Sequence, residues 1–423
     1  MSVPSVSTPA SQIQGNKIAH FVGDTGDYWR LLIRGNVLVA VTLGIYRFWL
    51  ATDMRRFLWS HTQIGGETLE YTGRGIELFL GFLIAIAVLV PIYVGVIGVS
   101  FAVPGWQDFA TSILFLVLFV LGQFAVYRAR RYRLTRTVFR GVRLHQSGSA
   151  WIYAFRAVAW WIPVFLTLGL AYPWAQANLE RYKMRHTFFG DMPGRFDGTG
   201  TSLFLRYIVL WLILVVPVVL ILARVSAADW SLLATQIAQS ARNGTKVPTQ
   251  SSSALLALVF APLWIFFVGM VLAPAYEAIT MRWWLSGVRF GEIALASNLR
   301  KRSVYGIYLR FLLGMFLLSI AGGIVGGVIA GFVATTAISL KGSGAAAVAA
   351  QILGTIFGVV LYVAYLLAIS TIYQVVVKLA LWRLAVESLD VSNFHLVELV
   401  KAEGQQSSPF GEGLADALNV GSF

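Results

Sequence analysis

Six long apolar runs alternate with short polar connectors along the chain. A helix needs about 20 mainly apolar residues to cross the hydrocarbon layer of a membrane, and each run reaches that length. The pattern therefore predicts six transmembrane helices. They are expected at residues 76–103, 107–127, 202–224, 254–278, 305–335 and 346–377.

Two further segments, 30–50 and 151–174, are apolar but interrupted by charge. The first contains Arg34 and Arg47, and the second contains Arg156. Charged side chains are costly within the hydrocarbon layer, so neither segment suits a full crossing. We expect both to be re-entrant or interfacial helical elements that enter and leave on the same face.

Polar and apolar residues alternate in several connectors. Glycines follow the alternation, as in Tyr71-Thr72-Gly73-Arg74-Gly75. Period-two alternation closed by glycine predicts a strand and a turn. The expected ribbons begin at residues 62–64, 137–139, 187–189 and 288–290. Because unpaired strand edges at a membrane surface are costly, we expect these small β-ribbons to pair into one sheet.

Lysine and arginine are concentrated in one set of connectors. Those at 51–75, 128–150, 176–201 and 279–304 contain 19 of them, against 3 in those at 98–110, 225–253 and 336–346. Positive residues beside transmembrane helices mark the cytoplasmic side, so the ribbons and both termini are predicted to be cytoplasmic. The same placement accounts for the net charge of +14 without nucleic acid binding.

The composition excludes several classes of protein. With 57% hydrophobic and 12% charged residues, the chain is far from an ordinary soluble domain. The absence of cysteine excludes disulfides, thiolate metal sites and cysteine nucleophiles. The first 20 residues have neither the basic nor the apolar region of a signal peptide. We expect disordered cytoplasmic tails at residues 1–20 and 401–423.

A shift of 125 residues superposes part of the chain on itself. From residue 42 to 80, 13 of the 39 positions are identical in the shifted copy, which predicts a duplicated unit. We therefore divide the chain into a first membrane repeat (21–150), a second (151–304) and an appended helical hairpin (305–400). The expected fold class is an all-α polytopic membrane protein with small cytoplasmic β-ribbons.

An arginine followed by an aromatic residue recurs before each expected ribbon. The aligned pairs are Arg56-Phe57, Arg131-Tyr132, Arg181-Tyr182 and Arg282-Trp283. A fifth, degraded copy around Leu381-Trp382 lacks the arginine. Guanidinium groups beside aromatic rings at a membrane surface suit phosphate headgroups or an anionic solute. The plainer interpretation is topological anchoring by positive charge, with the aromatic residues forming a belt.

Two other pairs of polar residues are candidates for a role. His61 and His186 are equivalent in the repeat, and a pair brought together by pseudo-symmetry would sense pH or bind metal. The simpler expectation is that each imidazole bonds a local backbone group; with no third ligand in sight, we predict no metal site. Glu77 and Glu277 lie near the ends of apolar runs and are expected to be charge partners of the aligned arginines.

The pieces TLGIYRFW (42–49) and YTGRG (71–75) resemble the YjgN family of bacterial inner-membrane proteins, a domain of unknown function. TLGLAYPW (167–174) extends the resemblance to the second copy, and the general plan extends it to residues 20–400. The resemblance implies a multi-pass protein of the bacterial inner membrane. It brings no activity or catalytic residue. Ala171 and Tyr172 replace Tyr46 and Arg47, so the two copies have diverged.

No catalytic pattern is present. The chain lacks a His-x-x-x-His pair, a Gly-x-Ser-x-Gly elbow and a phosphate-binding loop, so we expect neither an enzyme nor a cofactor. The leading hypothesis is transport of, or interaction with, an anionic solute or lipid. The alternative is a membrane-anchored scaffold whose ribbons bind a protein partner. Expected partners are membrane lipids, a small anionic solute and a second copy of the chain in a homo-oligomer.

Overall fold

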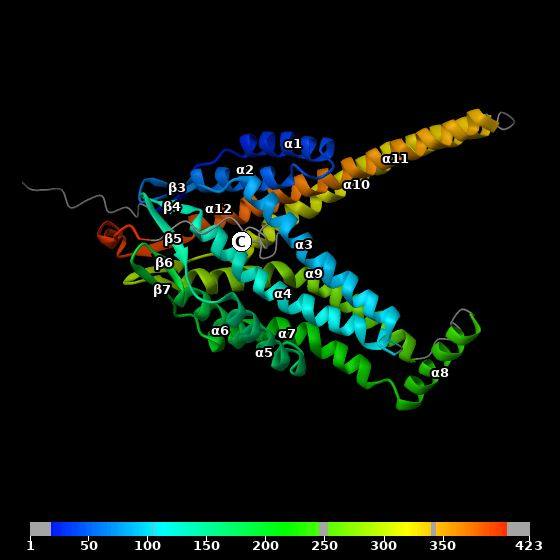
Figure 1. Cartoon of the computed structure of the whole chain (residues 1–423), viewed down its shortest axis with the longest axis horizontal. Coiled ribbons are helices and arrows are strands. Elements are labelled where there is room, and N and C mark those ends of the chain that lie inside the picture. Colours follow the sequence, from blue (N-terminus) through cyan, green and yellow to red (C-terminus); the bar gives the residue numbers. More distant parts are fainter. Residues whose placement is uncertain (1–17, 104, 245–252, 340–343, 404–423) are drawn as a thin grey trace, which may run out of the picture.

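The computed structural model has a small sheet at one end and long helices that extend away from it (Figure 1). We call the first the sheet end and the second the outer end. The structure describes residues 18–103, 105–244, 253–339 and 344–403. Most of the two predicted tails therefore lies outside the described residues.

Within the described residues, six helices are long and apolar enough to cross a membrane, which confirms the predicted number. They are α3 (Gly75–Ala102), α4 (Gln107–Thr135), α7 (Gly200–Ala223), α9 (Ser253–Gly287), α10 (Lys301–Ser339) and α11 (Gly344–Ile372). Helix α11 continues through a π-helix, η1 (Tyr373–Leu379), into α12 (Ala380–Glu387). Several helices outrun their predicted ends, because an α-helix does not stop where apolar residues give way to polar ones.

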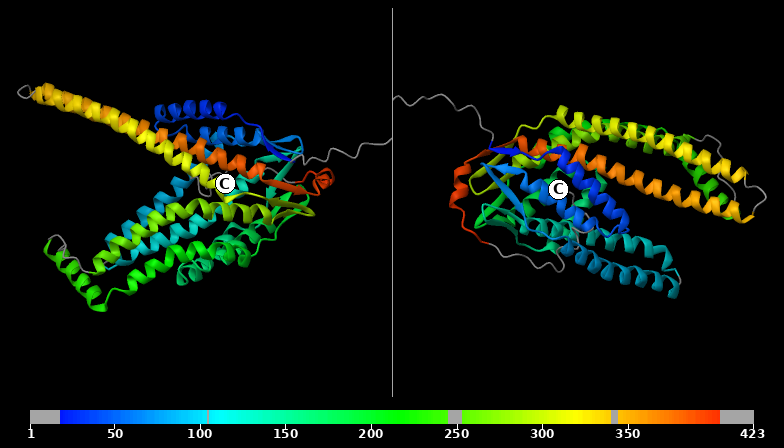
Figure 2. Two further views of the ribbon diagram at one scale, coloured as in Figure 1. Left: turned by 180° about the vertical axis from the view of Figure 1, so that it is seen from behind. Right: turned by 90° about the horizontal axis from the view of Figure 1, so that it is seen from above.

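The long helices form three hairpins that diverge toward the outer end (Figures 1 and 2). These hairpins are α3–α4, α7–α9 and α10–α11. At most a tenth or so of each apolar window is buried within the chain, so lipid must cover the remaining apolar surface. The connector 225–253 contains a helix that the hydropathy pattern did not reveal, α8 (Ala227–Asn243). Ser226 caps its N-terminus, and Gly244 ends it in the left-handed conformation.

Each interrupted apolar segment forms part of a helix pair that reverses direction, as predicted. The pairs are α1 (Thr25–Val41) with α2 (Arg47–Ser60), and α5 (Ala150–Leu166) with α6 (Tyr172–Arg185). The Thr-Leu-Gly motif makes each turn: Leu43 and Gly44 have φ of 51° and 93°, and Leu168 and Gly169 have 51° and 90°. In both turns the threonine hydroxyl accepts a backbone N–H from four residues further on. The shared motif thus encodes a helix reversal.

The ribbons pair into a single antiparallel sheet, which confirms that prediction. The strands are β1 (Ala19–Phe21), β2 (Thr62–Ile64), β3 (Glu67–Tyr71), β4 (Thr137–Phe139), β5 (Val142–Gln146), β6 (Thr187–Phe189), β7 (Met192–Phe196), β8 (Val288–Phe290), β9 (Ile293–Ser297) and β10 (Leu389–Ser392). They pair in chain order, and the edge strands β1 and β10 also contact each other. The all-α class is therefore corrected to a mostly helical fold with a ten-stranded sheet.

The curled sheet encloses an apolar core that includes Phe139, Phe189 and Val391. A 3₁₀-helix, η2 (Phe394–Leu399), covers the hairpin turns and adds its own apolar side chains to this core. At the first turn, a Cβ on Gly65 would lie 2.1 Å from the ring of Phe394, and φ is +61° there, so only glycine fits. The sheet end is thus closed by the chain's own last described segment.

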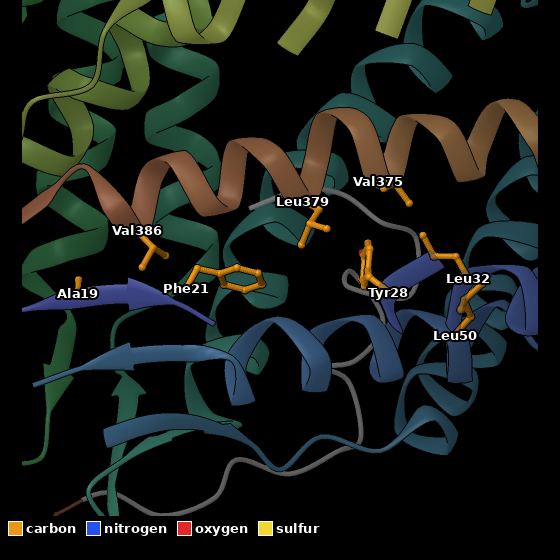
Figure 3. Close-up of a cluster of buried hydrophobic side chains, with 8 residues drawn as sticks. All are labelled: Ala19, Phe21, Tyr28, Leu32, Leu50, Val375, Leu379 and Val386. Carbon is orange, nitrogen blue, oxygen red and sulfur yellow. The ribbon is translucent and has the colours of Figure 1, made fainter. Parts of the chain in front are cut away.

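A second apolar cluster joins the beginning of the chain to its end (Figure 3). Ala19 and Phe21 of β1, Tyr28 and Leu32 of α1, and Leu50 of α2 pack with Val375, Leu379 and Val386. The Asn36 amide also donates to the Thr371 hydroxyl across this seam, at 2.6 Å. The α1–α2 pair is therefore fixed against η1 and α12.

Candidate functional site

Three of the four aligned arginines bind a glycine carbonyl across their own ribbon. The bonds are Arg56 Nη2 to Gly73 O (2.8 Å), Arg131 Nη2 to Gly148 O (2.5 Å) and Arg181 Nη2 to Gly198 O (3.2 Å). The separation is 17 residues each time. Each guanidinium thus ties the helix before a ribbon to the residues that begin the next helix. The constant Arg-to-Gly spacing was visible in the sequence and would have revealed this clamp.

The fifth copy retains its clamp, which corrects the expectation that it lacks an arginine. Arg383 Nη2 donates to Gly23 O at 2.8 Å, and its guanidinium lies 5.4 Å from the ring centroid of Phe21. The sequence alignment around Leu381-Trp382 was two residues out of register. Arg282 is the exception: it is exposed, and no bond of its side chain is found within the described ranges.

Removing the clamp of Arg383 is expected to destabilise the junction of the two chain ends. A hydrogen bond to a charged group contributes about 1.5–3 kcal/mol, so Arg383→Ala should lower the free energy of unfolding by about that amount. Arg282→Ala is the matched control and should change it by less than about 0.5 kcal/mol. Thermal unfolding of the purified variants in detergent measures both. Equal losses in the two variants would contradict the clamp.

His61 and His186 occupy equivalent places but serve separate backbone groups. His61 Nδ1 lies 2.7 Å from Phe57 O, and His186 Nδ1 lies 2.8 Å from Tyr182 O. His61 packs beside Gly23 and His186 beside Gly148, so the pseudo-symmetry does not join them into one site. Within the described residues, no group of three or more His, Asp or Glu side chains is arranged to hold a metal ion.

The two carboxylates have partners other than the aligned arginines, which corrects the expected pairing. Glu77 Oε2 accepts from Arg136 Nε at 3.0 Å and from the Tyr132 hydroxyl at 2.8 Å. Glu277 accepts from the Tyr308 hydroxyl. The aligned arginines lie on the helices that lead into the ribbons, and three of them, Arg56, Arg131 and Arg181, donate to glycine carbonyls instead.

A groove of about 500 Å³ lies between the helices α1 and α2. We call it the α1–α2 groove. Its polar lining residues are Arg30, Arg34, Tyr46, Asp53, Arg56, Ser60 and His61. It brings together one aligned arginine and two arginines of the interrupted segment. Gly35 allows the two helices to approach, because a Cβ there would lie 2.2 Å from the side chain of Leu50.

The α1–α2 groove has an excess of positive charge. Arg56 lies 3.9 Å from Asp53, while Arg30 pairs with Asp27 at 3.0 Å on the exposed surface of α1. Burial raises the pKa of the Asp53 carboxyl above its ordinary value, and Arg56 and Arg34 oppose that rise. Arg34 is exposed and has no hydrogen bond or ion pair within the described parts of the chain. Its five donors are available to a ligand.

The α5–α6 pair has the same Thr-Leu-Gly turn as the α1–α2 pair but carries different side chains at the positions equivalent to the groove. The positions 125 residues after Arg30, Arg34 and Asp53 are Phe155, Ala159 and Asn178. Only the arginine equivalent to Arg56 is retained there. A second cavity of about 680 Å³, between α2 and the strands β3 and β4, also contains Arg56 but is balanced by Glu67 and Glu70. The α5–α6 pair therefore places its basic residues differently: it lacks the equivalents of Arg30 and Arg34 but has Arg185 at the position equivalent to Ser60.

A buried polar cluster joins α4, α6 and α9, and the sequence analysis missed it. Lys183 donates to Glu180, and the indole of Trp284 donates to the other oxygen of this carboxylate at 3.0 Å. Arg130 donates to the sulfur of Met184 at 3.1 Å beside this pair. The i, i+3 spacing of Glu180 and Lys183 on a polar helix was the available sign, but such spacing is common on solvated surfaces.

Comparison with known proteins identifies relatives of this chain. The profile of a family described as a bacterial protein of unknown function, DUF898, matches residues 17–417. The inner membrane protein YjgN of Salmonella typhimurium is 24% identical over 164 residues, and that of Escherichia coli O157:H7 is 28% identical over 163. Each match covers 38% of both chains, so the chain spans about two fifths of the length of these curated relatives. No solved structure matches.

Proposed function

Since the chain belongs to the DUF898 family of bacterial proteins of unknown function, we propose that this integral inner-membrane protein binds a phosphate-bearing anion in the α1–α2 groove. The ligand is a lipid headgroup or a small anionic solute, and the protein takes part in its transport or handling. The observation that carries the proposal is that Arg30, Arg34 and Arg56 line one groove in which Asp53 is the single carboxylate of the lining.

The chemistry of the groove suits a phosphate group. Guanidinium groups present donors in a planar fork that matches phosphate oxygens. Ser60 adds a hydroxyl, and His61 adds an imidazole at the same wall. Of the four aligned arginines, only Arg56 lines this groove. The proposed anion contacts are therefore Arg30, Arg34 and Arg56.

The position of the groove favours a ligand at the membrane surface. The turn of the α1–α2 pair exposes 94% of Leu43 and 74% of Val41, which is unfavourable in water and suits a re-entrant tip in hydrocarbon. The groove extends along α2 from Tyr46 at the turn to His61 beside the sheet, where the lysines and arginines of the connectors are concentrated. We place this end in the cytoplasm, following the distribution of positive charge, and thus beside anionic headgroups.

The two helix pairs differ in charge at equivalent positions. We infer that the α1–α2 and α5–α6 pairs descend from one unit, from the identities between residues 42–80 and their copy. The second pair then lost the groove's arginines at Phe155 and Ala159, so it contributes to the membrane surface without a binding site.

Anion binding by the purified protein in nanodiscs tests the proposal. Purified protein in zwitterionic nanodiscs is titrated with phosphatidylglycerol or, separately, with inorganic phosphate, so the two arms distinguish a headgroup from a soluble anion. Arg34→Gln and Arg30→Gln should each weaken binding about tenfold, the equivalent of about 1.4 kcal/mol. Arg181→Gln and Arg282→Gln are the matched controls and should leave it unchanged. Equal effects of all four substitutions would mean that general surface charge, rather than the groove, attracts the anion.

The second helix pair allows a reciprocal experiment. Phe155 and Ala159 are exposed, so their replacement by arginine does not disturb the core. Adding Asn178→Asp places a carboxylate at the position equivalent to Asp53, and Arg181 already stands at that of Arg56. This triple variant should bind a second equivalent of the anion. A stoichiometry that stays at one would show that arginine placement alone does not define the site.

The scaffold alternative has less support. Its expected docking surface was the ribbon turns, but the segment from Asn393 through η2 to Lys401 already contacts all four of them. Asn393 donates to Glu292 O, and the Lys401 N–H donates to Asp191, both at 3.0 Å. A partner would first have to displace this segment.

A further inference from the structure

Arg47, the first residue of α2, lies over two aromatic rings and outside the α1–α2 groove. Its guanidinium carbon is 4.7 Å from the ring centroid of Phe48 and 4.9 Å from that of Phe82 on α3. The rings attract the cation, but they offer its five N–H donors no oxygen acceptor. The contact therefore holds the guanidinium between α2 and α3 and leaves its donors for another group.

The charge of Arg47 is not compensated by the helices that hold it. The side chain is exposed and has no hydrogen bond or ion pair within the described residues. Helices α2 and α3 contain one carboxylate each, and both serve other cations. Asp53 lies 3.9 Å from Arg56, and Glu77 lies 3.0 Å from Arg136. An anion from outside the chain is needed to balance Arg47.

The depth of Arg47 makes an unbalanced charge costly. At about 1.5 Å per residue, α3 is about 42 Å long, and Phe82 lies about 10 Å from its first residue. The hydrocarbon layer is about 30 Å thick, so α3 centred in it extends about 6 Å beyond each boundary, and Phe82 lies about 4 Å inside one of them. Leu43 and Ile45 before Arg47, and Leu83 beside Phe82, are exposed apolar residues that suit such a depth.

The second helix pair has a neutral contact at the equivalent place. The residues 125 positions after Arg47 and Phe82 are Tyr172 and Tyr207, and their ring centroids are 6.2 Å apart. The Tyr172 hydroxyl accepts a hydrogen bond from the Tyr276 hydroxyl at 2.7 Å. The same turn thus packs against the following long helix without a charged residue. Packing of the helix pair alone therefore does not account for Arg47.

We propose that Arg47 binds the phosphate of an anionic phospholipid in the leaflet on the side of the sheet end. An arginine at the edge of the hydrocarbon layer is stabilised by an anion at the same depth, and the phosphodiester of a lipid is the anion that lies there. The planar guanidinium donates to two phosphate oxygens side by side. A headgroup with net negative charge, such as phosphatidylglycerol, balances the arginine, whereas a zwitterionic headgroup brings a cation of its own.

This site is separate from anion binding in the α1–α2 groove, because Arg47 is not among the residues that line that groove. A phosphate ion in water does not enter the hydrocarbon boundary. Titration with inorganic phosphate should therefore report the groove alone and leave the Arg47 site empty.

Native mass spectrometry tests the proposal by counting the phosphatidylglycerol molecules that stay bound to protein released from phosphatidylcholine nanodiscs with rising phosphatidylglycerol content. The measurement is made in the Arg34→Gln background, so that a lipid in the groove does not contribute. There Arg47→Gln should weaken retention of one phosphatidylglycerol about tenfold, the equivalent of about 1.4 kcal/mol. Arg206→Gln is the matched control and should leave it unchanged, because it removes an exposed arginine near the same end of α7.

Two further variants separate the geometry of the site from its charge. Arg47→Lys keeps the charge but loses the planar fork, so it should also weaken retention. Phe82→Leu keeps Arg47 but removes one of its two rings, and it should weaken retention about threefold. This second variant also guards against a local disturbance caused by replacing Arg47 itself.

Equal losses in Arg47→Gln and Arg206→Gln, or no loss in either, would overturn the proposal, because general surface charge would then account for any bound lipid. Retention of phosphatidylcholine as firm as that of phosphatidylglycerol would overturn it as well. Since every variant is compared in the Arg34→Gln background, a groove that binds no anion would leave these outcomes unchanged. Failure of the Arg47 site and failure of the groove are thus distinguishable.

Discussion

Glu77→Ala is expected to lower the free energy of unfolding by about 3–5 kcal/mol, because it leaves a buried guanidinium without its counterion. Arg136 is only 1% exposed, and its Nε donates to the Glu77 carboxylate at 3.0 Å. The Tyr132 hydroxyl, also buried, loses its acceptor in the same variant. The midpoint of thermal unfolding in detergent should fall accordingly.

Two further variants separate charge pairing from simple loss of packing. Glu67→Ala removes a carboxylate that is 52% exposed and pairs with Arg140, so it should cost less than about 1 kcal/mol. The double variant Glu77→Leu with Arg136→Met replaces both charges by apolar groups and should recover much of the loss. A double variant as unstable as Glu77→Ala would show that packing, not an unpaired charge, sets the cost.

Glu180→Gln is expected to have a comparable effect, but one that depends on pH. The side chains of Glu180 and Lys183 are 9% and 13% exposed, so the variant strands a buried ammonium at a cost of about 3–5 kcal/mol near pH 7. Burial alone would raise the pKa of Glu180, but Lys183, Arg130 and two hydrogen bonds hold it below its usual value. Burial lowers the pKa of Lys183.

The two directions fix the expected pH profiles. A carboxylate whose pKa is lower in the folded state stabilises the fold above its unfolded value of about 4.3, and this contribution is lost as pH falls through the folded pKa. The wild-type protein should therefore lose stability in acid, and Glu180→Gln should lose less. In that variant the cost of burying the Lys183 ammonium falls as pH rises toward the pKa of about 10.4 that lysine has in the unfolded chain. Stability in alkali should recover, and thermal unfolding in detergent recorded across the pH range measures both effects.

The membrane-crossing pattern could be predicted because it depends on local composition alone. Six apolar runs appear as six long helices, and the Thr-Leu-Gly turns reverse the two interrupted segments. The ribbons could also be predicted, because the alternation of polar and apolar residues and the glycines that follow it are local features of the sequence. Their arrangement in one sheet followed from the cost of unpaired edges, which is the same for any short strand.

The closure of the sheet could not be predicted, because its edges come from opposite ends of the chain. The segments 19–21 and 389–392 are too short to be predicted as strands from their own sequence. Each is extended because it pairs with a neighbouring strand. The α1–α2 groove could not be predicted for a related reason. Its charged residues come from two different helices, and the repeated motif includes only one of them, Arg56. Arg383 was not predicted because Trp382 was aligned with the aromatic residue of the other motifs. That alignment placed Leu381, rather than Arg383, at the arginine position.

The meeting of the two chain ends also sets a timetable for biogenesis. Arg383 and its acceptor Gly23 are 360 residues apart, and the same seam contains the apolar faces of α1 and α12. At about 5–20 residues per second, a ribosome needs about 20–70 s to deliver the second half of this contact. During that interval Tyr28 and Leu32 have no partner from the C-terminal helices. A nascent chain that ends before residue 375 therefore lacks the side chains that cover this apolar face.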